Sequence, residues 1–263
     1  MVPVAASSDA KLSTAELLYG HASSMGLQPA WVIPGGLFAV DIAGREAYIN
    51  LARSPLNSDN SVSLAKDKYV ARLILQRHGI PNIPFARPIN HDEADAFLAR
   101  HQQIIAKPVA GAGACDIHLV TQPEQLHALD ITEYILEKYI AGQEMRYLVL
   151  NGAVIGVHRS DYGTSVEATR DLERISYPAS EWDEALVESS LQITEIMGLN
   201  FGAVDYLIDD TGCAHVLEVN TMPGLKWFHA PTSGPIVDAA GLFMEALVAE
   251  ERRLNSPALV EEG

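Results

Sequence analysis

Three oxygen-bearing side chains late in the sequence, Asp205, Glu218 and Asn220, have the types and spacing of a divalent-cation site. They flank the segment 209–212, DDTG, whose composition predicts a tight turn between two strands of a hairpin. Alternation along those strands puts all three side chains on one face. Carboxylate and amide oxygens suit Mg²⁺, which keeps its waters and bridges to phosphate oxygens. A solvated face of an antiparallel sheet would show the same residues, so both interpretations stay open at this point.

The register of this hairpin decides how close the two acids lie. If Ile208 pairs with Cys213, Asp205 lies opposite Val216, and Glu218 becomes its diagonal neighbour at about 7 Å between backbone positions. Two carboxylates at that separation can share a cation. A slip of one residue would turn Asp205 to the other face of the sheet.

A second segment, around Lys107, suggests phosphate binding. This lysine ends an apolar strand expected at 104–106 and precedes a loop with Gly111 and Gly113, whose backbone N–H groups can approach phosphate oxygens closely. The loop has neither the P-loop nor the Rossmann spacing, and a plain turn between strands is the alternative. Lys68 and Lys107 both lie beside segments rich in breakers and not in an apolar stripe, which favours phosphate binding over a role in the core.

The elements that must position these residues are predicted from periodicity and from Gly and Pro breakers. A helix is expected over about 63–78, with Lys68 near its start, and another from a Ser180 cap through Met197. The dipeptide at 151–152, Asn-Gly, predicts a two-residue hairpin turn. Helices mixed with short strands predict an α+β fold.

The charge balance limits the possible partners. The 263 residues include 18 Lys and Arg against 34 Asp and Glu, a net charge of -16, which opposes binding to nucleic acid or to an anionic membrane. No apolar run reaches the roughly 18 residues of a membrane span. The first residues also lack the cationic start and apolar run of a secretory signal. We therefore expect a cytoplasmic protein that acts on small molecules.

Four segments in this order resemble the ATP-grasp superfamily, and within it the carboxylate–amine ligases, over about 61–249. They are KDKYVARLILQRHGIPNIP, IIAKPVAGAGACDIHLV, ILEKYIAGQE and FGAVDYLIDDTGCAHVLEVNTMPGL, in which EVNTMPG is the most specific signature. The segment EMRYLVLNGAVIGVHR most resembles the branch of cyanophycin synthetase, glutathione synthetase and ribosomal-protein glutamate ligase. D-alanine:D-alanine ligases are more distant, because they carry an arginine where this chain has Ala203 and have a fuller N-terminal lobe.

The resemblance implies an ATP-grasp fold, in which two α+β lobes grip ATP, with a reduced N-terminal lobe and divisions at 1–62, 63–140 and 141–263. It also implies ATP and two Mg²⁺ ions, or Mn²⁺, with the metal on Asp205, Glu218 and Asn220. The implied nucleotide ligands are Lys68, Lys107, Gly111 and Gly113 at the phosphates, Glu137, Lys138, Tyr139 and Ile140 at the hinge beside adenine, and Glu144 at the ribose.

The implied reaction joins the carboxylate of an amino acid or peptide to an amine through an acylphosphate, with release of ADP and phosphate. Arg159 and Arg146, with Lys107, are the implied catalytic residues, and Lys226 and Arg174 are the implied substrate contacts. For Arg146, a surface ion pair with a neighbouring glutamate is the alternative. Two other functions stay open: a small-molecule kinase of the same superfamily and a non-catalytic nucleotide-binding module.

The short first lobe contains apolar residues that need a covering surface. A homodimer built on the strands of this lobe would cover them, with two-fold symmetry as the default. The alternative is that the segment folds back onto the C-terminal lobe of its own chain. The residues concerned are Trp31, Val32, Ile33, Leu37 and Phe38.

Overall fold

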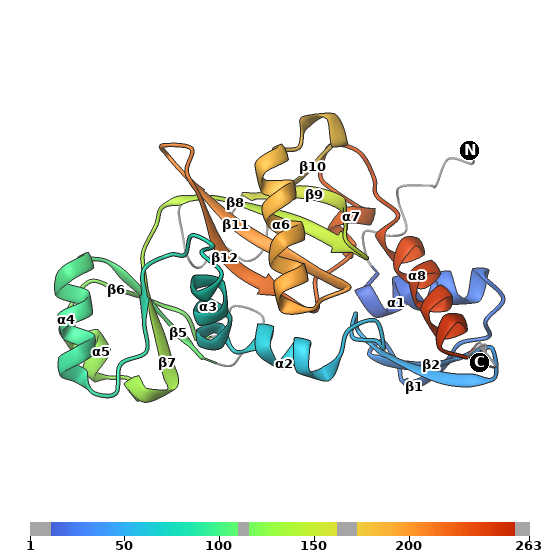
Figure 1. The fold of residues 1–263 in the computed structure, drawn as a ribbon, viewed down its shortest axis with the longest axis horizontal. Helices are drawn as coiled ribbons and strands as arrows, with labels where there is room; N and C mark the ends of the chain where they lie inside the picture. The colour runs from blue at the N-terminus through green and yellow to red at the C-terminus, as the bar shows by residue number, and fades with distance from the viewer. Residues whose placement is uncertain (1–11, 110–115, 162–172, 256–263) are drawn as a thin grey trace, which may run out of the picture.

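The computed structural model describes residues 12–109, 116–161 and 173–255, which form an α+β fold built on three antiparallel sheets (Figure 1). The sheets follow one another along the longest axis. The N-terminal sheet lies at one end, the small-lobe sheet lies at the other, and the largest sheet lies between them (Figure 1). The predicted α+β class is confirmed.

The first sheet is covered by helices from both ends of the described chain. Its strands pair in the order β1–β2–β3, and the two helices pack against each other and against β2. The elements are β1 (Ala30–Ile33), β2 (Leu37–Ile42), β3 (Arg45–Asn50), α1 (Thr14–Ser24) and α8 (Ala239–Asn255).

This packing covers most of the apolar surface of the first lobe within one chain. Phe38 is fully buried in a core cluster that includes residues of α1 and α8. Trp31 stacks on Tyr19 with ring centroids 4.4 Å apart. Val32 and Ile33, on the edge strand β1, remain 52% and 58% exposed. Most of these apolar residues are therefore covered within the same chain, as the fold-back alternative expects.

The small lobe is a four-stranded sheet of order β4–β7–β5–β6 with α4 and α5 packed against it. Alternate strand residues such as Ile104, Ala106 and Leu136 point into its core. The side chains of Lys107 and Glu137 therefore project from the opposite face of the sheet. The elements are β4 (Phe85–Ala86), α4 (His91–His101), β5 (Ile104–Pro108), β6 (His118–Val120), α5 (Pro123–His127) and β7 (Tyr134–Lys138).

The helix expected over 63–78 is in fact two helices, α2 (Asp59–Lys66) and α3 (Lys68–Arg77). Asp67 separates them because its backbone is extended and its side chain accepts a hydrogen bond from the Val70 N–H at 2.9 Å, as the N-cap of α3. This break makes Lys68 the first residue of α3. The lobe boundaries at 62 and 140 stay a proposal.

The largest sheet joins five strands in the order β10–β9–β8–β11–β12. The helix α6 lies across one face (Figure 1), where Tyr147 and Tyr206 are buried against it. Its N-cap is Asp183 and not Ser180, because the Asp183 carboxylate accepts hydrogen bonds from two backbone N–H groups of the first turn. The elements are β8 (Gly142–Leu150), β9 (Ala153–Asp161), β10 (Glu173–Tyr177), α6 (Glu184–Met197), β11 (Phe201–Asp209), β12 (Ala214–Asn220) and α7 (Lys226–His229).

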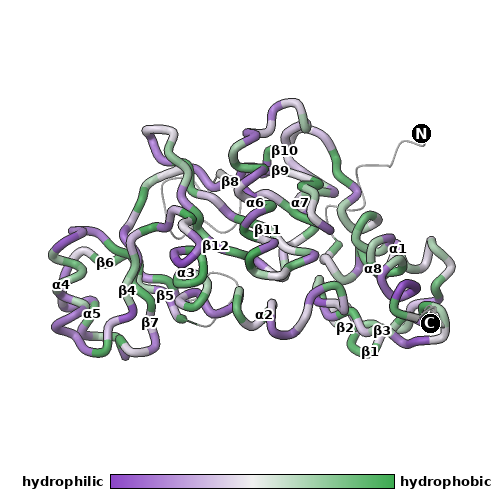
Figure 2. The backbone as a smooth tube through the Cα atoms, in the orientation of Figure 1, coloured by the Kyte–Doolittle hydropathy of each residue, from purple (hydrophilic) through white to green (hydrophobic). Residues whose placement is uncertain are grey.

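Hydrophobic and hydrophilic stretches interleave along the chain, as Figure 2 shows. In the parts of the chain that the structure describes, no helix is both long and apolar enough to cross a membrane.

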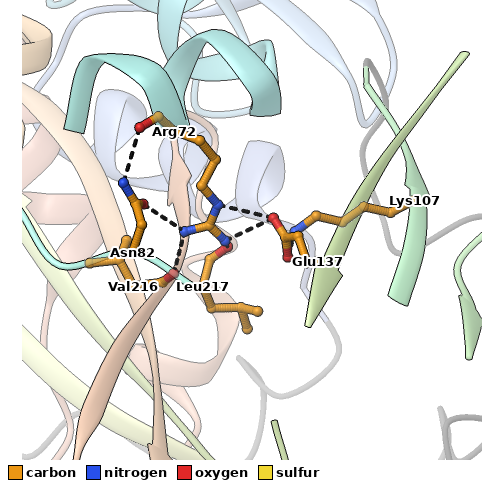
Figure 3. A network of polar contacts seen from close by, with 6 residues as sticks. All are labelled: Arg72, Asn82, Lys107, Glu137, Val216 and Leu217. Atoms are coloured by element: carbon orange, nitrogen blue, oxygen red, sulfur yellow. Dashed lines mark hydrogen bonds and ion pairs between the residues drawn. The ribbon is translucent and has the colours of Figure 1, made fainter. Parts of the chain in front are cut away.

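Arg72 on α3 connects the small lobe to the large sheet (Figure 3). Its guanidinium donates to the Glu137 carboxylate on β7 at 3.0 Å, to the Val216 carbonyl, and to the Leu217 carbonyl at 2.9 Å. It also donates to the Asn82 side chain at 3.2 Å. One buried cation therefore fixes α3, β7 and β12 relative to one another.

We predict that Arg72→Met destabilises the protein by about 3–5 kcal/mol, because it leaves buried acceptors without their charged donor. Urea unfolding followed by circular dichroism measures this loss. Arg77→Met, which removes an exposed cation from the same helix, is the matched control and should change the free energy of unfolding little. Equal stabilities for the two variants would contradict the role given to Arg72.

Candidate active site

The β11–β12 hairpin does not have the register expected from its turn. Ile208 pairs with Ala214, Tyr206 pairs with Val216, and the register then shifts so that Asp205 lies directly opposite Glu218. The prediction that Asp205 faces Val216 is wrong, because the turn is longer by one residue and β12 carries a bulge. The two acids are therefore direct cross-strand neighbours, at about 5 Å between Cβ atoms.

Register across the whole sheet extends this pair into a row. Asp205 pairs with Arg146 on β8, Arg146 pairs with His158 on β9, and His158 pairs with Ser176 on β10. Directly paired residues share a face, so the row lies on the face that α6 leaves open, called here the site face. A second row beside it consists of His215, Leu207, Glu144, Ser160 and Arg174.

The three predicted metal ligands lie together on the site face. Asn220 pairs with Ala203 and so follows Glu218 along the same side of β12. Its side-chain oxygen accepts one hydrogen bond, from the Met222 N–H at 3.0 Å, and keeps a second lone pair. Two carboxylates and one amide oxygen are a donor set that fits Mg²⁺.

The charges around Glu218 favour a cation at this position. Burial raises the pKa of Glu218, and the Asp205 carboxylate raises it further, while Lys68, Lys107 and Arg146 lower it; the balance is upward. A bound divalent cation would reverse that balance. Both predicted phosphate lysines thus act on the pKa of Glu218.

Arg146 forms a two-point ion pair with a predicted metal ligand. Its Nε and Nη2 atoms donate to the two carboxylate oxygens of Asp205 at 2.6 and 2.7 Å. This geometry is the planar fork that arginine offers to carboxylates and phosphates. Arg146 thus lies within the row of the site face.

Lys107 and Glu137 form a buried ion pair with Nζ and Oε2 2.7 Å apart, beside Arg72 (Figure 3). Burial raises the pKa of Glu137, but Lys107 and Arg72 together outweigh it and hold that pKa below its ordinary value. Burial lowers the pKa of Lys107. The sequence predicts that Lys107 serves phosphate binding and has no role in the core. The second part of that prediction is wrong, because the Lys107 side chain is only 7% exposed and forms a salt bridge inside the protein.

Three of the four predicted hinge residues line a pocket of about 640 Å³. Lys138, Tyr139 and Ile140 form one wall, and the β11–β12 turn with His215 forms another. Glu144 is half-buried on β8, in the second row of the site face. Gly111 and Gly113 lie outside the described residues.

The structure does not bring Arg159 to the site face. Arg159 pairs with Met145 and Ile175 and lies on the α6 side, where it donates to the Tyr177 hydroxyl at 3.3 Å. A bulge at Ile155 is the reason, since an unbroken count from the Asn-Gly turn would place Arg159 on the other face.

Arg174 occupies the site face instead, opposite Ser160. Its Cζ atom lies 5.4 Å from the centroid of the Trp227 ring, and the Lys226 Nζ atom lies 4.6 Å from the same ring. Both predicted substrate contacts therefore meet on one aromatic side chain.

Sequence reasoning did not find His158, Ser160 or Ser176, which are all buried on the site face. Alternation of the side chains between the two faces of β9 and β10 could identify them. That alternation assigns the correct face only when the bulge at Ile155 is taken into account.

The sequence also matches a known family: the family profile of the RimK-like ATP-grasp domain covers residues 65–241. The chain belongs to the RimK-like ATP-grasp family. This family member is 30% identical over 222 residues to the probable alpha-L-glutamate ligase of Aeromonas salmonicida (strain A449), covering 77% of this chain and 70% of the relative. It is 24% identical over 215 residues to the D-alanine–D-alanine ligase of Bacillus anthracis (strain CDC 684 / NRRL 3495), covering 74% and 69%.

Among solved structures, a bifunctional glutathione synthetase from Pasteurella multocida superposes on this RimK-like ATP-grasp chain with a TM-score of 0.67. The two are 15% identical, and the match covers 93% of this chain and 45% of that one, so it supports the fold alone. Together with the named relatives, the family makes this protein an ATP-dependent carboxylate–amine ligase that uses ATP with a divalent metal.

We predict that Glu218→Gln nearly abolishes ADP formation while the fold is retained, because the site loses a charged metal ligand. The pKa of Glu218 is raised in the folded protein. Its ionised form therefore costs stability once the pH rises above the ordinary pKa of a glutamate, about 4.3. Without metal at neutral pH, the variant should melt no lower than the wild type. Melting with and without Mg²⁺ and a coupled ADP assay measure both effects.

Glu188→Gln, on the exposed side of α6, is the matched control and should keep full turnover. Wild-type turnover by the Glu218 variant would exclude the metal assignment.

Proposed function

We propose that this enzyme activates the carboxylate of an amino acid or peptide as an acylphosphate and then joins it to an amine, releasing ADP and phosphate. The observation that carries the proposal is the direct pairing of two acids, Asp205 and Glu218, beside the Arg146 fork on Asp205. Lys68, Lys107 and Arg146 all lower the pKa of Glu218. A polyanion with its metal needs that combination, because the cations bind phosphate oxygens and the acids bind the metal.

Lys68 and Lys107, with Gly111 and Gly113 of the adjacent loop, would hold the ATP phosphates. Two Mg²⁺ ions, or Mn²⁺, would be held by Asp205, Glu218 and Asn220, and bound metal supplies charge neutralisation at the transferred phosphoryl group. Lys107 would serve both the phosphates and Glu137, to which it is paired at 2.7 Å.

The hinge pocket is the proposed place for the nucleoside. Adenine would lie against Lys138, Tyr139 and Ile140, three lining residues of the 640 Å³ pocket, and would meet the backbone carbonyl of Glu137. Glu144 would accept hydrogen bonds from the ribose hydroxyls.

Two site-face arginines are the proposed stabilisers of negative charge on the reacting carbon. Arg146 and Arg174 lie on neighbouring rows of the site face, and a guanidinium keeps its charge throughout the reaction. Arg174 and Lys226, both against Trp227, would also bind the carboxylate of the substrate. Arg159 has no place in this mechanism.

We predict that Arg174→Met lowers kcat/KM by about a hundredfold, as for the loss of one donor to a developing negative charge. Arg159→Met is the matched control, since it removes the same group from the next strand on the opposite face, and should stay within the order of magnitude of the wild type. Steady-state ADP release measures both variants. An effect of Arg159→Met as large as that of Arg174→Met would contradict the assignment by faces.

The reaction class has a direct test. We expect that incubation with ATP, Mg²⁺ and hydroxylamine across a panel of amino acids and short peptides yields a hydroxamate, because hydroxylamine traps an acylphosphate. Colorimetric detection with ferric ion and mass spectrometry identify the product. A stable phosphorylated product would indicate the kinase alternative, and ATP binding without either product would indicate a binding module.

The proposed location and partners of the enzyme follow from its charge and its exposed apolar residues. We keep the cytoplasm as its expected location and expect no nucleic-acid or membrane partner, since the net charge is -16. A homodimer through the first lobe stays a prediction, with Val32 and Ile33 on β1 as the apolar residues still exposed there.

A further inference from the structure

His158 is a buried polar side chain in the middle of the site face that the mechanism above does not use. It is 1% exposed, and neither ring nitrogen has a hydrogen-bond partner in another described residue. The hydroxyl of Ser176, its direct neighbour on β10, is also buried and without a partner in the described chain. Unsatisfied buried polar groups are rare because each costs free energy, so two adjacent ones indicate a ligand that completes them.

The surroundings of the ring are cationic on two sides and apolar on a third. Arg146 is its direct neighbour on β8, Arg174 lies two residues from Ser176 on β10, and the Phe228 ring of α7 lies 4.7 Å away. Burial lowers the pKa of His158 to about 3, and Arg146 and Arg174 contribute to that shift. The imidazole is therefore neutral, with one N–H donor and one acceptor nitrogen.

We propose that His158 binds the attacking amine of the ligase reaction, with its acceptor nitrogen receiving a hydrogen bond from the amine N–H and Ser176 providing a second contact. The proposal rests on the proposed function, since it assigns the amine site of that reaction. The row explains the placement: His158 is next to Arg146, which is next to the metal ligand Asp205. An amine held there lies beside the carbon that Arg146 and Arg174 would stabilise.

The same environment selects the protonation state of the amine. Burial and two neighbouring guanidinium groups disfavour a positive charge on the His158 ring, and they disfavour an ammonium ion beside it for the same reason. An amine bound there is therefore held as the free base, whose lone pair is the nucleophile. A neutral acceptor is sufficient at such a site, because the amine is bound as the free base. The proton that its nitrogen loses after attack on the acyl carbon leaves with the released phosphate.

The test measures the KM for hydroxylamine in hydroxamate formation, at saturating ATP and with a carboxylate that the wild type accepts. His158→Phe keeps the ring volume against Phe228 but removes the acceptor, and we expect the KM for hydroxylamine to rise about tenfold while the KM for ATP stays unchanged. His158→Gln restores an acceptor and should recover most of the loss. His127→Phe, a surface histidine bonded to Asp95 on α4, is the control.

The outcomes distinguish a failure of the proposed function from a failure of the role given to His158. If no carboxylate gives a hydroxamate with the wild type, the proposed function fails and the inference fails with it. If the wild type forms hydroxamate and His158→Phe has the wild-type KM for hydroxylamine, the role of His158 is overturned while the ligase assignment stands. If His158→Phe does not fold, as judged by its melting curve, His158→Met takes its place in the same measurement.

Discussion

The position of β12 relative to the small lobe depends on one buried cation, Arg72. Its guanidinium is shared between the Glu137 carboxylate of the small lobe and two consecutive carbonyls of β12. The second carbonyl belongs to Leu217, the residue left unpaired by the bulge in β12. The contact that joins the lobes therefore also satisfies the backbone at the irregularity that turns Glu218 toward Asp205. Lys107 reaches the same carboxylate from β5, so the proposed phosphate lysine and the strand with the proposed metal ligands share one anchor.

The electrostatic design of the site opposes that of the chain as a whole. The protein carries a net charge of -16, yet Lys68, Lys107 and Arg146 all lower the pKa of Glu218. In an acidic protein, a local concentration of positive charge lies where an anionic ligand binds. The Asp205 carboxylate raises the pKa of Glu218, and a divalent cation held by both acids, as proposed, would turn that repulsion into binding.

The two faces of the large sheet divide stability from chemistry. On the α6 side, Tyr147 and Tyr206 are buried with apolar neighbours, and Arg159 extends toward the Tyr177 hydroxyl. On the site face, the same strands present acids, arginines and His158. Because side chains alternate strictly along a strand, a change of register by one residue exchanges the two sets. Register is accordingly the quantity that decides which residues can take part in the reaction.

The sequence by itself determined the α+β class, the turns at Asn151 and Gly212, and the family, because local turn chemistry and motif spacing are encoded in adjacent residues. It also pointed to Asp205 and Glu218 as a pair. It did not determine that the pair is directly opposed, or that His158 and Arg174 replace Arg159 on the site face. Both outcomes follow from single-residue bulges in β9 and β12, which depend on how the strands pack and on partners distant in sequence, such as Arg72. Alternation along a single strand does not carry that information, since the extra residue of a bulge is defined by the pairing with a neighbouring strand.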